Sequence, residues 1–167
     1  MEQTVYILLG PKGSGKSFIG SLIDQNFDIK FIRVENWAKQ IVNNRSIEDD
    51  NYLRNVFTTI EHGIRNELSH NDKVVFESTG LTPYFNGMLT NLKNDFLVKT
   101  IEVKADEELC LHRVKNRDQS IHINVSDEQV KRINQRVQEK MIPCDFTIEN
   151  NDKSEDGILL QLKMFLN

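Results

Sequence analysis

The chain has 167 residues, of which 38% are hydrophobic and 28% are charged, and its formal net charge at pH 7 is −4. This length is that of one ordinary domain, so we expect a single domain over residues 1–167. The composition excludes a disordered chain, and the acidic balance excludes a protein that coats nucleic acid with its whole surface. No apolar run approaches the roughly 20 residues that span a bilayer. The lack of such a run favours a protein without membrane contact. The two cysteines form no CxxC pair, which favours a reducing cytoplasm.

Short apolar runs of strand length alternate with longer segments of helical period along the chain. Because these runs show little polar alternation, they are typical of strands buried on both faces of a parallel sheet. The alternation predicts a three-layer α/β domain with about five strands and right-handed crossovers. The predicted strands are Val5–Leu9, Ile29–Val34, Val74–Glu77, Val98–Val103 and Asp145–Glu149.

Capping residues indicate where the intervening helices begin. The longest predicted helix opens at the capping box Ser46-Ile47-Glu48-Asp49 and runs towards Leu68. The other predicted starts are Lys16 after a glycine-rich loop, Thr82 before Pro83, Asp106, the capping box at Ser126, and Ser154. Between two of these helices, Asp118–Val125 has no regular pattern and is interpreted as a mobile loop.

The segment Gly10-Pro11-Lys12-Gly13-Ser14-Gly15-Lys16-Ser17 matches GxxxxGK[ST] in full, directly after a predicted strand and before a helix. Its glycines let the main-chain N–H groups wrap a phosphate, and the following helix adds its positive N-terminal end. We expect Lys16 to reach the β- and γ-phosphates of a nucleotide and the Ser17 hydroxyl to bind Mg²⁺. All eight residues are therefore predicted to bind nucleotide.

The phosphate loop, the small size and a later arginine-bearing helix resemble the small P-loop kinases. This group includes shikimate and gluconate kinases, nucleoside monophosphate kinases, the kinase domain of polynucleotide kinases and zeta-toxin-like proteins. The resemblance covers nearly the whole chain in layout, although only the phosphate loop is a specific motif. It implies a P-loop fold with a five-stranded parallel sheet, helices on both faces, a small lid over ATP, and phosphoryl transfer to a second substrate.

Glu35 follows the second predicted strand, where similar kinases often carry an Asp that accepts the proton of the attacking hydroxyl. A carboxylate at this end of a strand faces the site of an open α/β sheet. Glu35 is therefore a candidate base and acceptor contact, and the alternative is a solvated Glu stabilised by the dipole of a starting helix. Trp37 is either an acceptor contact or a residue that packs the second helix.

Glu77 ends the third predicted strand, and an acidic residue after an apolar strand is typical of a carboxylate that holds Mg²⁺ or its water. The run Glu-Ser-Thr-Gly that begins there is similar to the corresponding stretch of zeta-toxin-like kinases. The resemblance implies that Thr79 and Gly80 line the acceptor pocket. The alternative is a turn that Gly80 closes after the strand.

Arg113 and Arg117 are spaced i and i+4, so they lie on one face of their helix. In similar kinases such a pair flanks the lid and neutralises charge on the transferring phosphoryl group, which here implies a lid at about 113–136 and places Arg113 also against the nucleotide. The alternative is a surface pair that forms salt bridges. Arg132 and Arg136 form a second pair. His122 is interpreted as a surface-loop histidine, and the alternative is a lid residue that contacts substrate.

The sequence lacks the Asn-Lys-x-Asp motif that reads guanine and the Asp-x-x-Gly switch, so ATP is favoured over GTP. We expect an ATP- and Mg²⁺-dependent kinase that phosphorylates a hydroxyl or phosphate of a small molecule or nucleotide. Two alternatives stay open, namely a nucleotide-binding regulatory module with little turnover and a nucleic-acid 5′-hydroxyl kinase. Neither the acceptor nor the oligomeric state is predicted.

Overall fold

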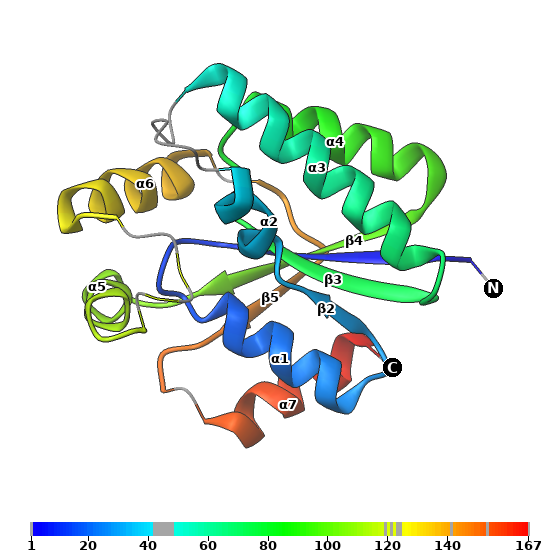
Figure 1. The fold of residues 1–167 in the computed structure, drawn as a ribbon. Coiled ribbons are helices and arrows are strands. Elements are labelled where there is room, and N and C mark those ends of the chain that lie inside the picture. Colours follow the sequence, from blue (N-terminus) through cyan, green and yellow to red (C-terminus); the bar gives the residue numbers. More distant parts are fainter. Residues whose placement is uncertain are drawn as a thin grey trace.

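The computed structural model contains one sheet of five strands, and every pair of neighbouring strands runs parallel, in the order β2-β3-β1-β4-β5 (Figure 1). The strands are β1 (Thr4–Leu9), β2 (Lys30–Ile32), β3 (Lys73–Ser78), β4 (Leu97–Lys104) and β5 (Phe146–Glu149). The structure describes residues 2–41, 49–118, 120, 122, 125–140, 142–152 and 154–166. The expected P-loop type of α/β fold, with a five-stranded parallel sheet, is confirmed.

Helices cover both faces of this sheet. They are α1 (Lys16–Asn26), α2 (Val34–Ile41), α3 (Asp50–Leu68), α4 (Pro83–Asp95), α5 (Glu107–Lys115), α6 (Asp127–Lys140) and α7 (Glu155–Leu166). Figure 1 shows α1 and α7 on one face and α2, α3 and α4 on the other, whereas α5 and α6 lie beyond the carboxyl ends of the strands. No helix in the described part of the chain is long and apolar enough to cross a bilayer.

The central strand β1 is buried on both sides. Ile7 packs into the apolar cluster beneath α2, α3 and α4, and its neighbour Leu8 packs into the cluster beneath α1 and α7. Both side chains are 0% exposed, and burying such a side chain contributes about 1.5–3 kcal/mol. Since β1 lies between β3 and β4, the loop that follows it opens at the middle of the sheet, where open α/β sheets bind their ligands.

Two predicted boundaries are wrong. The second strand ends at Ile32, because it pairs only with β3 at the sheet edge and helix α2 already begins at Val34, inside the predicted strand. The long helix α3 begins at Asp50, because the Asp49 side chain accepts a hydrogen bond from the Tyr52 N–H (2.8 Å) and thereby caps it. The predicted cap at Ser46 and the two residues after it lie outside the described residues.

The other helix starts agree with their capping signals. Thr82 accepts from the Phe85 N–H (3.2 Å), and Ser126 and Gln129 cap each other reciprocally at 3.2 and 2.9 Å. Asp106 precedes α5 as predicted, but its carboxylate accepts from Asn151 (3.3 Å) instead of capping the helix.

Helix α2 packs closely on α3 where the Trp37 side chain lies over Gly63. A Cβ at this position would lie 2.3 Å from Cη2 of Trp37, whereas a Cβ at Gly87 in α4 would meet nothing within 4 Å. Alanine in a helix interior is about 1 kcal/mol more favourable than glycine, but overpacking costs about 1–3 kcal/mol. We therefore expect Gly63→Ala to lower the free energy of unfolding in urea and Gly87→Ala to raise it. Adding Trp37→Leu should relieve the Gly63→Ala defect, and equal stabilisation by both alanines would contradict this contact.

Candidate active site

The loop Gly10–Ser17 joins β1 to α1, as its motif predicts. Gly13 (φ 85°) and Gly15 (φ 97°) adopt left-handed backbone conformations that glycine accepts without steric cost. A side chain would also have no room there, because a Cβ would lie 2.2 Å from the Cys110 carbonyl oxygen at Gly13 and 2.2 Å from Asn150 Nδ2 at Gly15. The loop is therefore walled by α5 and by the chain that follows β5.

Lys16 lies against this loop and is only 8% exposed. Its Nζ donates to the carbonyl oxygens of Gly10 (2.9 Å) and Pro11 (2.7 Å). Burial lowers the pKa of the Lys16 ammonium to about 8, and the nearby Glu77 carboxylate opposes that shift. At neutral pH most of the lysine is still charged, so it supplies a cation whose present partners are neutral oxygens that a phosphate can replace.

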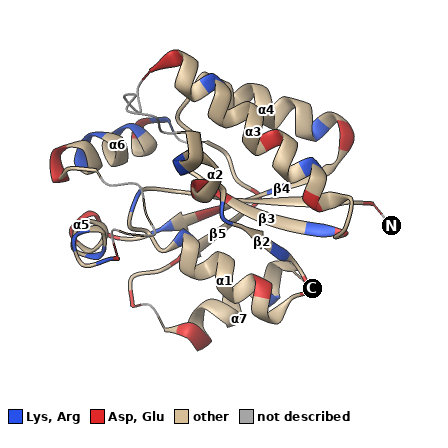
Figure 2. Ribbon diagram, viewed as in Figure 1, with Lys and Arg blue, Asp and Glu red and all other residues tan. Residues whose placement is uncertain are grey.

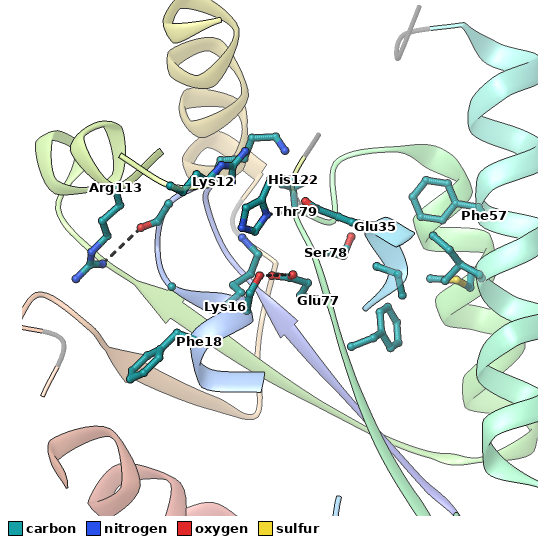
Figure 3. Close-up of a pocket in the computed structure, with 18 residues that line it drawn as sticks. Lys12, Lys16, Phe18, Glu35, Phe57, Glu77, Ser78, Thr79, Arg113 and His122 are labelled. Carbon is teal, nitrogen blue, oxygen red and sulfur yellow. Dashed lines mark hydrogen bonds and ion pairs between the residues drawn. The ribbon is translucent and has the colours of Figure 1, made fainter. Parts of the chain in front are cut away.

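Glu77 leaves β3 beside the first turn of α1. Its Oε1 accepts a hydrogen bond of 2.5 Å from the Ser17 hydroxyl (Figure 3). These are the two residues that the sequence predicts for Mg²⁺, and a hydroxyl and a carboxylate are oxygen donors of the kind that Mg²⁺ prefers. Among the described residues no group of three or more His, Cys, Asp or Glu side chains could hold a metal ion.

Glu35 lies in the first turn of α2 and points into the same cavity (Figure 3). His122, which is interpreted from sequence as a surface-loop residue, instead lies beside it. The distance from His122 Nδ1 to Glu35 Oε2 is 3.1 Å, and the two side chains are 15% and 24% exposed. The structure thus brings together a carboxylate and an imidazole that are 87 positions apart in the sequence.

The two predicted arginines both line the cavity, but their guanidinium groups have different partners. Arg113 Nη2 donates to the Asn150 carbonyl (2.8 Å) and Nη1 to the Ser14 carbonyl (3.4 Å), so its guanidinium is committed to main-chain oxygens behind the loop. Arg117 instead interacts with the carboxylates of Glu35 and Glu77, which oppose the effect of burial in lowering its pKa. Arg113 thus uses its fork to hold the loop in this structure, and the contact of the arginine pair with the transferring phosphoryl group stays a prediction.

A buried amide holds the tip of the same loop. Asn134 of α6 is 2% exposed, and it accepts from the Lys12 N–H (2.7 Å) while its Nδ2 donates to the Lys12 carbonyl (3.0 Å). Burial lowers the pKa of the Lys12 ammonium, and Glu35 opposes that shift. Arg132 and Arg136, which flank Asn134 on this helix, are exposed. Polar and apolar spacing alone would not single out Asn134.

These groups surround one cavity of about 340 Å³ at the carboxyl ends of the strands. Basic residues of the loop, α5 and α6 gather at this end of the sheet (Figure 2). Residues of the predicted lid at 119, 121, 123 and 124 lie outside the described residues. The lining residues that the sequence did not predict are Phe18, Val34, Phe57, Ile60, Phe76, Ser78, Met88 and His122. Helical periodicity finds the apolar ones as core positions but cannot indicate which of them border a cavity.

Thr79 lines this cavity, but two other predicted acceptor contacts do not. Trp37 packs over Gly63 and borders a separate groove next to β2. Gly80 is buried beneath Ile142, and its carbonyl accepts a hydrogen bond from Lys140. The packing of Trp37 and the turn at Gly80 explain these residues without a ligand.

Residues 5–140 match the family model described as AAA domain. The chain belongs to this family. A shikimate kinase from Macrococcus caseolyticus (strain JCSC5402) is 28% identical over 114 residues, which cover 67% of this chain but only 63% of that protein. The solved structure of TT1252 from Thermus thermophilus is similar with a TM-score of 0.69 and 20% identity, covering 99% of this chain and 97% of that one. The structure of shikimate kinase from Bacteroides thetaiotaomicron is similar with a TM-score of 0.68 and 13% identity, covering 98% of each chain. These two structures share the fold.

The amide clamp at Asn134 predicts a measurable defect. Asn134→Ala removes both hydrogen bonds and leaves the partly buried main-chain groups of Lys12 without that partner, which costs about 1–3 kcal/mol. We expect a lower free energy of unfolding in urea and faster hydrogen exchange of the Lys12 amide. The control is Gln135→Ala, because Gln135 is exposed and donates to Glu139 on its own helix. If both variants matched the wild type, the clamp would not hold the loop.

Proposed function

We propose that this protein is a Mg²⁺-dependent kinase that transfers the γ-phosphoryl group of ATP to a hydroxyl group of a small molecule. The observation that carries the proposal is that one cavity beside the phosphate loop holds two carboxylates with different partners. Glu77 is bonded to the Ser17 hydroxyl, whereas Glu35 is paired with His122. This difference in partners suits Glu77 for binding a metal ion and Glu35 for accepting a proton.

The phosphates of ATP would lie on the N–H groups of the loop and on the N-terminus of α1. Lys16 would exchange its two carbonyl partners for phosphate oxygens. Lys12 and Arg117 line the same cavity and would offset the charge of the transferring group. Phe18, which is 36% exposed and lines the cavity beside Arg113, offers an apolar surface for the adenine ring (Figure 3).

The metal fits this donor set. Ser17 and Glu77 would hold Mg²⁺, with phosphate oxygens and water as further ligands, since Mg²⁺ in kinases is usually bound by one or two protein carboxylates and the substrate phosphates. When bound, the ion would neutralise negative charge on the β- and γ-phosphates.

The transfer itself needs a deprotonated acceptor. Glu35 would accept the hydroxyl proton while the acceptor oxygen forms a bond to the γ-phosphorus. The bond between that phosphorus and the bridging oxygen of the β-phosphate would break, and ADP would leave with this oxygen. His122 would keep the Glu35 carboxylate oriented. The AAA-domain membership and the relative named shikimate kinase support this type of chemistry.

The decisive measurement is ADP release, with ATP and Mg²⁺, in a screen of sugars, shikimate-like acids, nucleosides and 5′-hydroxyl oligonucleotides. We expect acceptor-dependent turnover that Lys16→Met lowers by about 100-fold or more, equivalent to about 2.7 kcal/mol.

Glu35→Gln should depress turnover and leave ATP affinity nearly unchanged, whereas Glu77→Gln should raise the Mg²⁺ requirement. ATP binding without any turnover would favour a regulatory module, and full activity of Lys16→Met would contradict the proposal.

Replacing Arg113 and replacing Arg117 should have different effects on turnover and on stability. Arg117→Ala is expected to lower kcat by about 10- to 1000-fold with little change in ATP affinity, because its charge matters most when charge builds on the transferring group. Arg113→Ala should lower the free energy of unfolding and weaken ATP binding, since it removes hydrogen bonds that hold the loop. Calorimetry with a non-hydrolysable ATP analogue and urea unfolding measure these effects. Equal kinetic defects with intact stability in both variants would show that Arg113 has the transfer role too.

A further inference from the structure

The cavity has two chemically different ends. The residues that α2, α3, β3 and α4 contribute beyond the phosphate loop are largely apolar. Phe57 and Ile60 come from α3, Val34 from α2, Phe76 from β3 and Met88 from α4. All five belong to, or pack against, the apolar cluster on this face of the sheet. The wall is therefore a continuation of the core that borders open space.

The positive charges of the cavity come from elsewhere in the chain. Lys12 and Lys16 belong to the phosphate loop, and the two arginines that line the cavity belong to or directly follow α5. In Figure 3, Glu35, Ser78 and Thr79 lie between Lys12 and Phe57. Among the described lining residues of α2, α3, β3 and α4 there is no lysine or arginine.

This arrangement selects against a charged acceptor body. A carboxylate placed at the apolar end would lose its hydration against Phe57 and Met88, and it would also be repelled by Glu35. Burying an ion without a partner is far more costly than burying a neutral group. An uncharged apolar body would instead gain about 25 cal/mol for each Å² removed from water.

We propose that the acceptor is an uncharged alcohol whose body is largely apolar. Its hydroxyl reaches Glu35 and its body packs against Phe57, Ile60 and Met88. The inference rests on the proposed kinase activity, and the bonds that form and break are those of the phosphoryl transfer proposed above. The hydroxyl proton goes to Glu35, the new bond joins the alcohol oxygen to the γ-phosphorus, and ADP leaves. Ser78 and Thr79 remain as polar groups for further hydroxyls of the acceptor.

Matched pairs of acids and esters test this substrate class. The probes are 4-(hydroxymethyl)benzoate with its methyl ester and shikimate with its methyl ester, because each pair differs in one negative charge. ADP release is measured with ATP and Mg²⁺, and the phosphorylated product is identified by mass spectrometry. For the wild type we expect kcat/KM to be higher for at least one ester than for its acid by about tenfold or more.

The variant Phe57→Arg adds a cation to the apolar wall, at a half-buried position that can accommodate it. It should shift the ratio of acid to ester by about tenfold or more towards the acid, as a new partner for the carboxylate. Phe57→Leu keeps the wall apolar and should retain the preference for the ester. Urea unfolding verifies that both variants are folded, and the leucine control reports what the loss of the ring alone does.

Each outcome decides the inference. A wild-type preference for esters that Phe57→Arg reverses and Phe57→Leu retains supports it. A wild-type preference for the acids overturns the neutral-acceptor class but leaves the kinase proposal intact. Turnover of neither ester, while a non-hydrolysable ATP analogue binds, also overturns the class. Failure of the wild type to bind that analogue overturns the proposed function itself and the inference with it.

Discussion

The geometry of the candidate site depends on side chains of α5, α6 and Asn150 that donate hydrogen bonds to the carbonyl groups of the phosphate loop. Asn134 holds both main-chain groups of Lys12, and Asn150 Nδ2 donates to the Ser14 carbonyl at 2.7 Å. Arg113 adds its guanidinium to the same carbonyl and to that of Asn150. These bonds hold the loop in one shape, and its Lys12 and Ser14 N–H groups are themselves bonded to Asn134 and to the Pro11 carbonyl, so a phosphate would meet other N–H groups of the loop. Preorganised donors of this kind need no rearrangement when charge develops.

The sheet topology decides what meets this loop. Because β1 is central, its loop lies next to the end of β3, and Ser17 and Glu77 come within hydrogen-bond distance. The short edge strand β2 turns directly into α2, whose first turn carries Glu35 over the same space. The unpredicted early end of β2 therefore matters for the site, since a strand that continued to Val34 would place Glu35 differently.

Charge is distributed unevenly along the cavity. The cations gather at the loop and α5, where burial lowers the pKa of Lys16 to about 8 and so weakens its hold on the proton in the absence of an anion. A bound phosphate would restore full protonation. At the opposite end the described lining residues of α3 and α4 are apolar, so the lysines and arginines and the apolar side chains line different parts of one cavity.

Local periodicity, capping and a contiguous motif were enough to predict the buried strands, most helix starts, the phosphate loop and the placement of Glu77. The pairing of His122 with Glu35, the clamp of Asn134 on a loop 122 positions away, and the separation of Arg113 from Arg117 emerged only from the packing of the folded chain. That packing also placed Trp37 and Gly80 outside the cavity, with Trp37 against Gly63 and Gly80 beneath Ile142. The difference arises because helical spacing indicates which residues share a face, whereas the partner of that face depends on how distant elements pack.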